Sequence, residues 1–179
     1  MSMDGYAATD DAQLLSAAQR GDRNAFASLY RRHAPAVFGL ALRFLGDRSA
    51  AEDIVQDVFL RALDQIDRIR DGDRLSGWLK RSAANASIDL IRKRRPEADP
   101  EVLEQIAGDI TDPSDPLQLP RLLDGLPPQT RALLWLFVVE GWTHTELAER
   151  FGRSESWSKS IISRVLQQLR TRVSSEQTP

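Results

Sequence analysis

The segment from Thr143 to Arg172 constrains the fold most, because it has the pattern of two amphipathic helices joined by a tight turn. Leu147, Ala148 and Phe151 fall on one side of the first helix, where the small alanine lets a second helix cross closely. Gly152 supplies the turn, since glycine tolerates the positive φ of a sharp helix end. We therefore predict a helix-turn-helix.

The second helix of this pair should begin near Glu155, capped by Ser154 or Ser156. Short polar and basic side chains occupy its first turns, which a helix-turn-helix places in the major groove of DNA. They are Ser156, Trp157, Lys159 and Ser160. The alternative is an ordinary helical hairpin, which occurs in many α proteins.

The N-terminal part also predicts helices throughout, with no alternating apolar and polar run that would indicate a sheet. The first helix, capped by Asp10 or Asp11, runs through Gln19. The second, capped by Asp22 or Asn24, runs through Leu45. Ser49 is the expected cap of the third. The helix ends fall at Gly21 and Gly46.

The third and fourth helices carry distinctive surfaces. The third buries Ile54, Val55, Val58, Phe59 and Ala62, and its other side is acidic, with Glu52, Asp53, Gln56 and Asp57. The fourth opens after Asp73 and has an apolar face of Trp78, Leu79, Ala83, Ile88 and Ile91. It closes with the basic run Arg92–Arg95, which is either a solvated helix end or a phosphate contact.

Charge is unevenly distributed along the chain, although its formal net charge is only −2. Residues 1–96 carry 16 basic and 13 acidic side chains, residues 97–118 carry seven acidic and no basic ones, and residues 119–179 carry eight basic and six acidic ones. The middle segment also holds three prolines, at positions 100, 113 and 116. We predict an all-α protein with two small helical domains, 1–96 and 119–179, on a flexible acidic linker with one short helix around 101–106.

Several function classes are excluded by composition. The chain has no cysteine and only two histidines, His33 and His144, so a metal site, a bound cofactor or a disulfide is not expected. No nucleophile and base pair supports an enzyme. No apolar run is long enough for a membrane helix or an export signal, so a soluble, cytoplasmic protein is expected.

Taken together, three motifs resemble the group IV, or extracytoplasmic-function, sigma factors of bacterial RNA polymerase. AEDIVQDVFLRAL is similar to the helix that contacts polymerase, GWLKRSAANASIDLIRKRR to the helix that opens the −10 element, and LPPQTRALLWLFVVEGWTHTELAERFGRS to the start of the −35-reading domain. Their order, their spacing and the acidic linker between them make the combination specific.

The resemblance implies a role for each set of residues. The acidic set Glu52, Asp53, Gln56 and Asp57 would meet the polymerase clamp helices. Asn85 would lie near the flipped −10 base, and the separated strand and upstream phosphates would be held by Lys80, Arg81, Arg92, Lys93, Arg94 and Arg95. Contacts with the −35 element would come from Arg153, Ser156, Trp157, Lys159, Ser160 and Arg164. Trp78 is expected to be core.

The C-terminal domain departs from the family pattern in its second helix. Arg153 and Ser158 stand where the family usually has apolar residues, Trp157 replaces a threonine and Ile161 an arginine. Trp157, Ile161, Val165 and Leu169 form an apolar stripe, for which repacked core is favoured over an exposed docking surface. The rest of the core is expected to comprise Leu126, Leu133, Leu134, Leu136, Phe137 and Val138, with Trp135 and Trp142 in or beside it.

The predicted function is promoter-specific initiation, with core RNA polymerase (clamp helices and flap), promoter DNA and an anti-sigma factor as partners. A sigma-like adaptor that binds polymerase or an anti-sigma factor but no promoter is the alternative. A two-component activator is disfavoured because the N-terminal half lacks the strands of a receiver. Phosphorylation of Ser49 or Ser82 is a further hypothesis.

Overall fold

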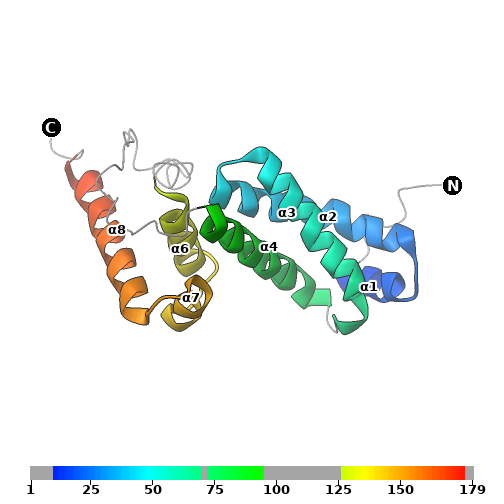
Figure 1. The fold of residues 1–179 in the computed structure, drawn as a ribbon. Helices are drawn as coiled ribbons and strands as arrows, with labels where there is room; N and C mark the ends of the chain where they lie inside the picture. The colour runs from blue at the N-terminus through cyan, green and yellow to red at the C-terminus, as the bar shows by residue number, and fades with distance from the viewer. Residues whose placement is uncertain (1–9, 70–71, 95–125, 176–179) are drawn as a thin grey trace. The chain divides into compact units, whose positions relative to one another are not determined.

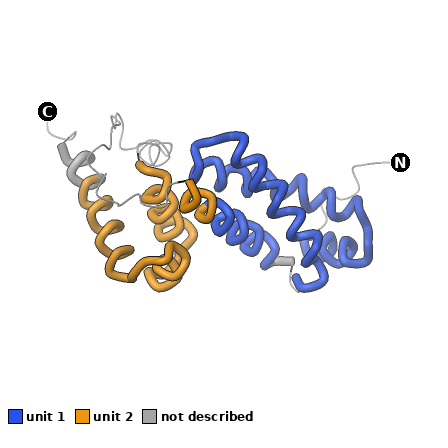
Figure 2. Tube along the Cα trace, in the orientation of Figure 1, with its two compact units in different colours: residues 1–87 blue, residues 88–179 orange. Residues whose placement is uncertain are grey.

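The computed structural model describes residues 10–69, 72–94 and 126–175, and every regular element within those ranges is helical, as predicted (Figure 1). The predicted linker 97–118, the short helix around 101–106 and Arg95 lie outside the described residues. The chain divides into two compact units, Met1–Ser87 and Ile88–Pro179, which Figure 2 draws in different colours.

The first unit is built on three helices, α1 (Asp11–Gln19), α2 (Arg23–Leu45) and α3 (Arg48–Asp64), followed by a short 3₁₀ turn, η1 (Ile66–Arg68). The helix α4 (Gly72–Arg94) follows, and the division between the units falls within it. α2 packs along α3 on one side and against α1 on the other. The predicted inward face of α3 is buried in full, and Phe44, Val37 and Leu79 are among the most buried side chains of the protein.

Helix boundaries agree with the sequence prediction except at α3 and α4. Asp22 caps α2 by accepting from the backbone N–H groups of Asn24 and Ala25, and Gly46 ends it with a φ of 65°. Ser49 is not the cap of α3, because it is already inside the helix. Asp47, in an extended conformation, accepts from the N–H of Ala50 at 3.1 Å. α4 begins at Gly72, slightly earlier than predicted.

α1 is fastened at both ends by polar side chains. Asp11 Oδ2 lies 2.7 Å from Nε2 of the buried His33, and Asp11 Oδ1 lies 2.5 Å from Nη1 of Arg32. At the other end, the amide of Gln19 donates to the backbone carbonyls of Ile66 and Ile69 at 2.9 and 2.8 Å. Asp10 has the N-cap position but no capping bond from its side chain.

The second unit contains α6 (Pro128–Val138), α7 (His144–Phe151) and α8 (Glu155–Ser175), and each of these helices contacts the other two. Thr143 and Glu146 form a reciprocal capping box at the start of α7. Gly152 ends α7 with a φ of 65°, as the predicted turn requires. α7 and α8 are therefore the predicted helix-turn-helix.

The predicted core of this unit is largely confirmed. Leu126, Leu133, Leu134, Leu136 and Trp142 are buried, whereas Phe137 and Trp135 are half-buried. Val138 was wrongly assigned to the core: it is the last residue of α6 and is exposed, together with the following Val139. The apolar stripe of α8 is repacked core at Ile161 and Val165, which are both buried.

Candidate functional site

The outward side of α3 carries the predicted acidic set. Glu52, Asp53 and Gln56 are exposed and Asp57 is half-buried, so the structure places all four on the solvent side of the helix. Two of the carboxylates form ion pairs one turn away, Glu52 with Arg48 at 2.9 Å and Asp57 with Arg61 at 2.5 Å. Exposed pairs of this kind contribute little stability, so these acids remain available to a charged partner.

Two leucines on the same side of α3 were missed by the sequence analysis. Leu60 and Leu63 are 63% and 48% exposed, which is high for large apolar side chains. At about 3.6 residues per turn, both fall within the arc that Glu52, Gln56 and Asp53 define. The available signal was that neither belongs to the inward-facing set. The face therefore combines charge with apolar surface, as protein interfaces do.

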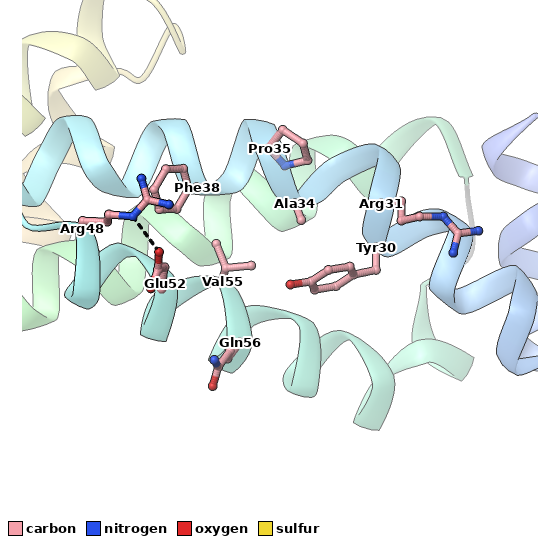
Figure 3. Close-up of a pocket in the computed structure, with 9 residues that line it drawn as sticks. All are labelled: Tyr30, Arg31, Ala34, Pro35, Phe38, Arg48, Glu52, Val55 and Gln56. Atoms are coloured by element: carbon pink, nitrogen blue, oxygen red, sulfur yellow. Dashed lines mark ion pairs between the residues drawn. The ribbon is translucent and has the colours of Figure 1, made fainter. Parts of the chain in front are cut away.

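A groove of about 450 Å³ adjoins this face (Figure 3). Its lining is mainly apolar and comes from α2 and α3, with Glu52 and Gln56 among the lining residues. The apolar part comprises Tyr30, Ala34, Pro35, Phe38 and Val55, and Arg31 and Arg48 complete the wall. The guanidinium of Arg48 also lies over the ring of Phe38, 5.5 Å from its centroid. Figure 3 shows the Arg48–Glu52 pair within this lining.

The predicted −10 residues are distributed along α4. Arg81 is exposed, and Lys80 and Asn85 are half-buried, with Arg81 and Asn85 one helical turn apart. Trp78 is half-buried, whereas its apolar neighbours Leu79, Ala83, Ile88 and Ile91 are buried. Arg92, Lys93 and Arg94 are exposed in the last turn of the helix. Within the second unit, Arg92 Nη1 donates to the carbonyl of Arg150 at 3.4 Å.

The first turns of α8 present the predicted −35 residues. Ser154 is the cap, because its hydroxyl accepts from the N–H of Trp157 at 3.1 Å. Exposed side chains of the set are Arg153, Ser156, Lys159, Ser160 and Arg164. Trp157 is half-buried, and its ring lies 5.6 Å from that of Phe151. Trp157 was predicted to contact DNA, but part of its side chain is covered by packing against α7.

Glu155, the first residue of α8, is a further polar residue on this surface that was not predicted as a site residue. One carboxylate oxygen accepts from the hydroxyl of Thr145 at 2.6 Å, and the other from the ammonium of Lys159 at 3.1 Å. The Thr145 bond first, and Lys159 second, lower the pKa of Glu155 from its usual 4.5. Glu155 is therefore ionised at neutral pH and links the two helices of the motif.

Ser158, one of the departures from the family pattern, has a partner inside the motif. Its hydroxyl is fully buried and lies 3.0 Å from Nδ1 of His144 at the start of α7. The imidazole in turn stacks on the ring of Phe137 from α6, with centroids 4.7 Å apart and planes at 28°. His144 thus contacts residues of α6 and α8 from its position at the start of α7.

The described part of the chain holds neither a metal-binding cluster nor a membrane-spanning helix. Among residues 10–69, 72–94 and 126–175, no group of three or more histidine, aspartate or glutamate side chains could hold a metal ion. None of the helices in those ranges is long and apolar enough to cross a membrane.

Two family comparisons match this architecture in order. Sigma-70 region 2 matches residues 29–97, which include the acidic face and α4, and Sigma-70 region 4 matches residues 117–169, which include the helix-turn-helix. Together the two matched ranges span well over half of the chain and include all three of the surfaces described above.

Relatives and solved structures agree with these matches. The chain is 34% identical to the sigma factor CarQ of Myxococcus xanthus, over 84% of this chain and 90% of CarQ. It is also 34% identical to the ECF sigma factor SigE of Mycolicibacterium smegmatis, over 84% of this chain, but it spans only 63% of SigE. A solved structure of CnrH in complex with the cytosolic domain of CnrY is 27% identical, covers 93% of this chain and 99% of CnrH, and has a TM-score of 0.53. The chain therefore belongs to the extracytoplasmic-function sigma factors of the sigma-70 family, which direct core RNA polymerase to initiate transcription at specific promoters.

Proposed function

We propose that this sigma factor divides its work among three surfaces, and that the outward side of α3 docks on the polymerase clamp helices. The support is the exposure of Glu52, Asp53 and Gln56 together with Leu60 and Leu63 on one helix side. The acids would pair with the cations of a basic partner at contact distance, and the leucines would supply the apolar contact that holds it. This combination on one face is the observation that carries the docking proposal.

The exposed side of α4 is proposed to capture the opened −10 element. The amide of Asn85 can both donate to and accept from the edge of an extruded base. Lys80, Arg81 and the basic helix end Arg92–Arg95 would neutralise backbone phosphates, although Arg95 lies outside the described residues. Leu79 is buried and lies nearly opposite Arg81 around the helix, so Arg81 is left on an exposed side of α4.

The helix-turn-helix is proposed to read the −35 element through α8. Arg153, Lys159 and Arg164 are exposed donors, and Ser156 and Ser160 are small enough to allow close approach to the groove. We propose that residues 1–96 and 119–179 act as separate modules on the acidic linker, in the cytoplasm and without catalytic activity of their own. We propose an anti-sigma factor as a further partner, since the similar chain CnrH was solved in complex with a second protein, the cytosolic domain of CnrY.

Docking is tested by exchanging the two exposed leucines. Leu60→Ser with Leu63→Ser is expected to weaken binding to core polymerase at least tenfold, since burying one leucine is worth about 1.5–3 kcal/mol. The control is Asp67→Ser, an exposed residue on η1 outside the acidic set. Equal affinity of the double variant and the control in a core-binding titration would rule out the docking role of this face.

Promoter opening is tested by run-off transcription with bacterial core polymerase on genomic fragments. The expected result is specific transcripts with the intact chain, and a strong loss with Asn85→Ala. Asn24→Ala, which changes an exposed asparagine on α2, is the matched control and should leave the transcripts unchanged. Binding of core without any transcript would instead support the adaptor that the sequence left as its alternative.

A further inference from the structure

Glu155 is an acidic residue on the surface of α8 that is proposed to contact DNA. It is the only acidic residue in the sequence of α8, and it stands in the first turn, where helix-turn-helix proteins contact base edges. The basic members of the predicted −35 set can only donate hydrogen bonds, which suits phosphates and guanine. A carboxylate can only accept them, so any hydrogen bond between Glu155 and DNA requires a donor group on the DNA.

Two hydrogen bonds, one from each helix of the motif, hold the side chain of Glu155 in a defined position. Thr145 belongs to α7 and Lys159 to the next turn of α8, so the carboxylate is fixed from both helices. Each carboxylate oxygen receives one of these bonds and has about two lone pairs. Glu155 therefore retains acceptor capacity on its exposed side, in an orientation that the free protein already sets.

Among the base edges of the major groove, cytosine offers the N4 amino group as a donor without an adjacent acceptor, and carboxylates pair with it. Phosphates and the acceptor edge of guanine would repel a carboxylate at the same place. We propose that Glu155 determines specificity at one position of the −35 element by accepting a hydrogen bond from the N4 amino group of a cytosine. This inference rests on the proposed reading of the −35 element by α8.

The test is run-off transcription by the reconstituted holoenzyme on a promoter library randomised across the −35 element, with sequencing of the transcribed templates. The intact protein should prefer cytosine at one position by about tenfold over the other bases. Glu155→Ala should abolish that preference and leave the other positions unchanged. Glu155→Gln should shift it toward adenine, which an amide recognises through paired donor and acceptor groups.

Glu149→Ala provides the control, because it removes the same charge from an exposed position of α7. Its base preferences should match those of the intact protein. The inference is overturned if Glu155→Ala keeps the cytosine preference, if it lowers transcription equally for all sequences, or if Glu149→Ala also erases the preference. If the intact holoenzyme gives no promoter-dependent transcript, the proposed function itself fails, which separates the two outcomes.

Discussion

Replacing His144 with phenylalanine is expected to destabilise the second unit, because it removes the partner of a buried hydroxyl. Ser158 is fully buried, and its hydroxyl lies 3.0 Å from Nδ1 of His144. A phenyl ring keeps the aromatic stack on Phe137 but offers no hydrogen-bonding atom. The change therefore isolates the polar contact from the packing of the ring.

The expected loss of stability follows from the Ser158 hydroxyl, which is left without its hydrogen-bond partner. A buried polar group without its partner costs about 1–3 kcal/mol, which corresponds to about 4–8 °C in Tm for each kcal/mol in a domain of this size. Ser158→Ala should cost less, about 0.5–1.5 kcal/mol, because the half-buried imidazole can be hydrated. In the double variant no hydroxyl remains to be satisfied, so its cost should fall below the sum of the two single costs by about 1 kcal/mol.

The assay is urea unfolding of the full chain, followed by tryptophan fluorescence in a Trp78→Phe background. Of the four tryptophans in the sequence, Trp78 alone precedes residue 88, so the remaining signal reports the second unit. Equal stability of His144→Phe and the parent protein would refute the reasoning. The backbone carbonyl of Ser154, the N-cap residue one turn before Ser158, would then be the acceptor for the hydroxyl.

Two further predictions concern the same unit. Gly152→Ala should destabilise it by about 1–2 kcal/mol, because a φ of 65° is strained for any residue with a Cβ. Gly39→Ala, in the interior of α2, is the contrasting change in the first unit. It should stabilise that unit by about 0.5–1 kcal/mol, because alanine is the better helix former. Urea midpoints that move in the same direction for both would contradict this. Because the pKa of Glu155 is below its usual 4.5 in the folded protein, the ionised carboxylate stabilises the fold above pH 4.5, and this contribution is lost as the pH falls through the folded pKa. Thr145→Val removes the largest cause, so carboxyl NMR titration should show the pKa of Glu155 rising, and an unchanged pKa would contradict the assigned cause.

Helix identity could be predicted from this sequence because the apolar periodicity and the caps agree. The buried face of α3, the ends of α2 and the turn at Gly152 follow from local patterns alone. The cap of α3 could not be distinguished in the same way, since Asp47 and Ser49 are both good capping residues two positions apart. The choice depends on where the chain leaves Gly46, which is a matter of tertiary packing.

The candidate surfaces were predicted less completely, because exposure and partners depend on other helices. Leucine is a typical core residue, so the sequence alone does not show that Leu60 and Leu63 face solvent. Their exposure is seen only once the helices are packed. The reverse holds for Ser158, a polar residue that is buried because His144 lies opposite it across the motif. Val138 was misplaced because the α6 pattern does not show that the helix ends there.

The arginines of α3 change how its acidic face attracts a charged partner. Arg48 and Arg61 act as built-in counter-ions for Glu52 and Asp57, so at long range the face presents a weaker field than its acid content implies. A basic surface that arrives must exchange places with these arginines at contact distance. The face should therefore bind flexible polycations weakly, because their binding depends only on long-range attraction. It should bind more strongly to a partner that places one cation against each of the two carboxylates.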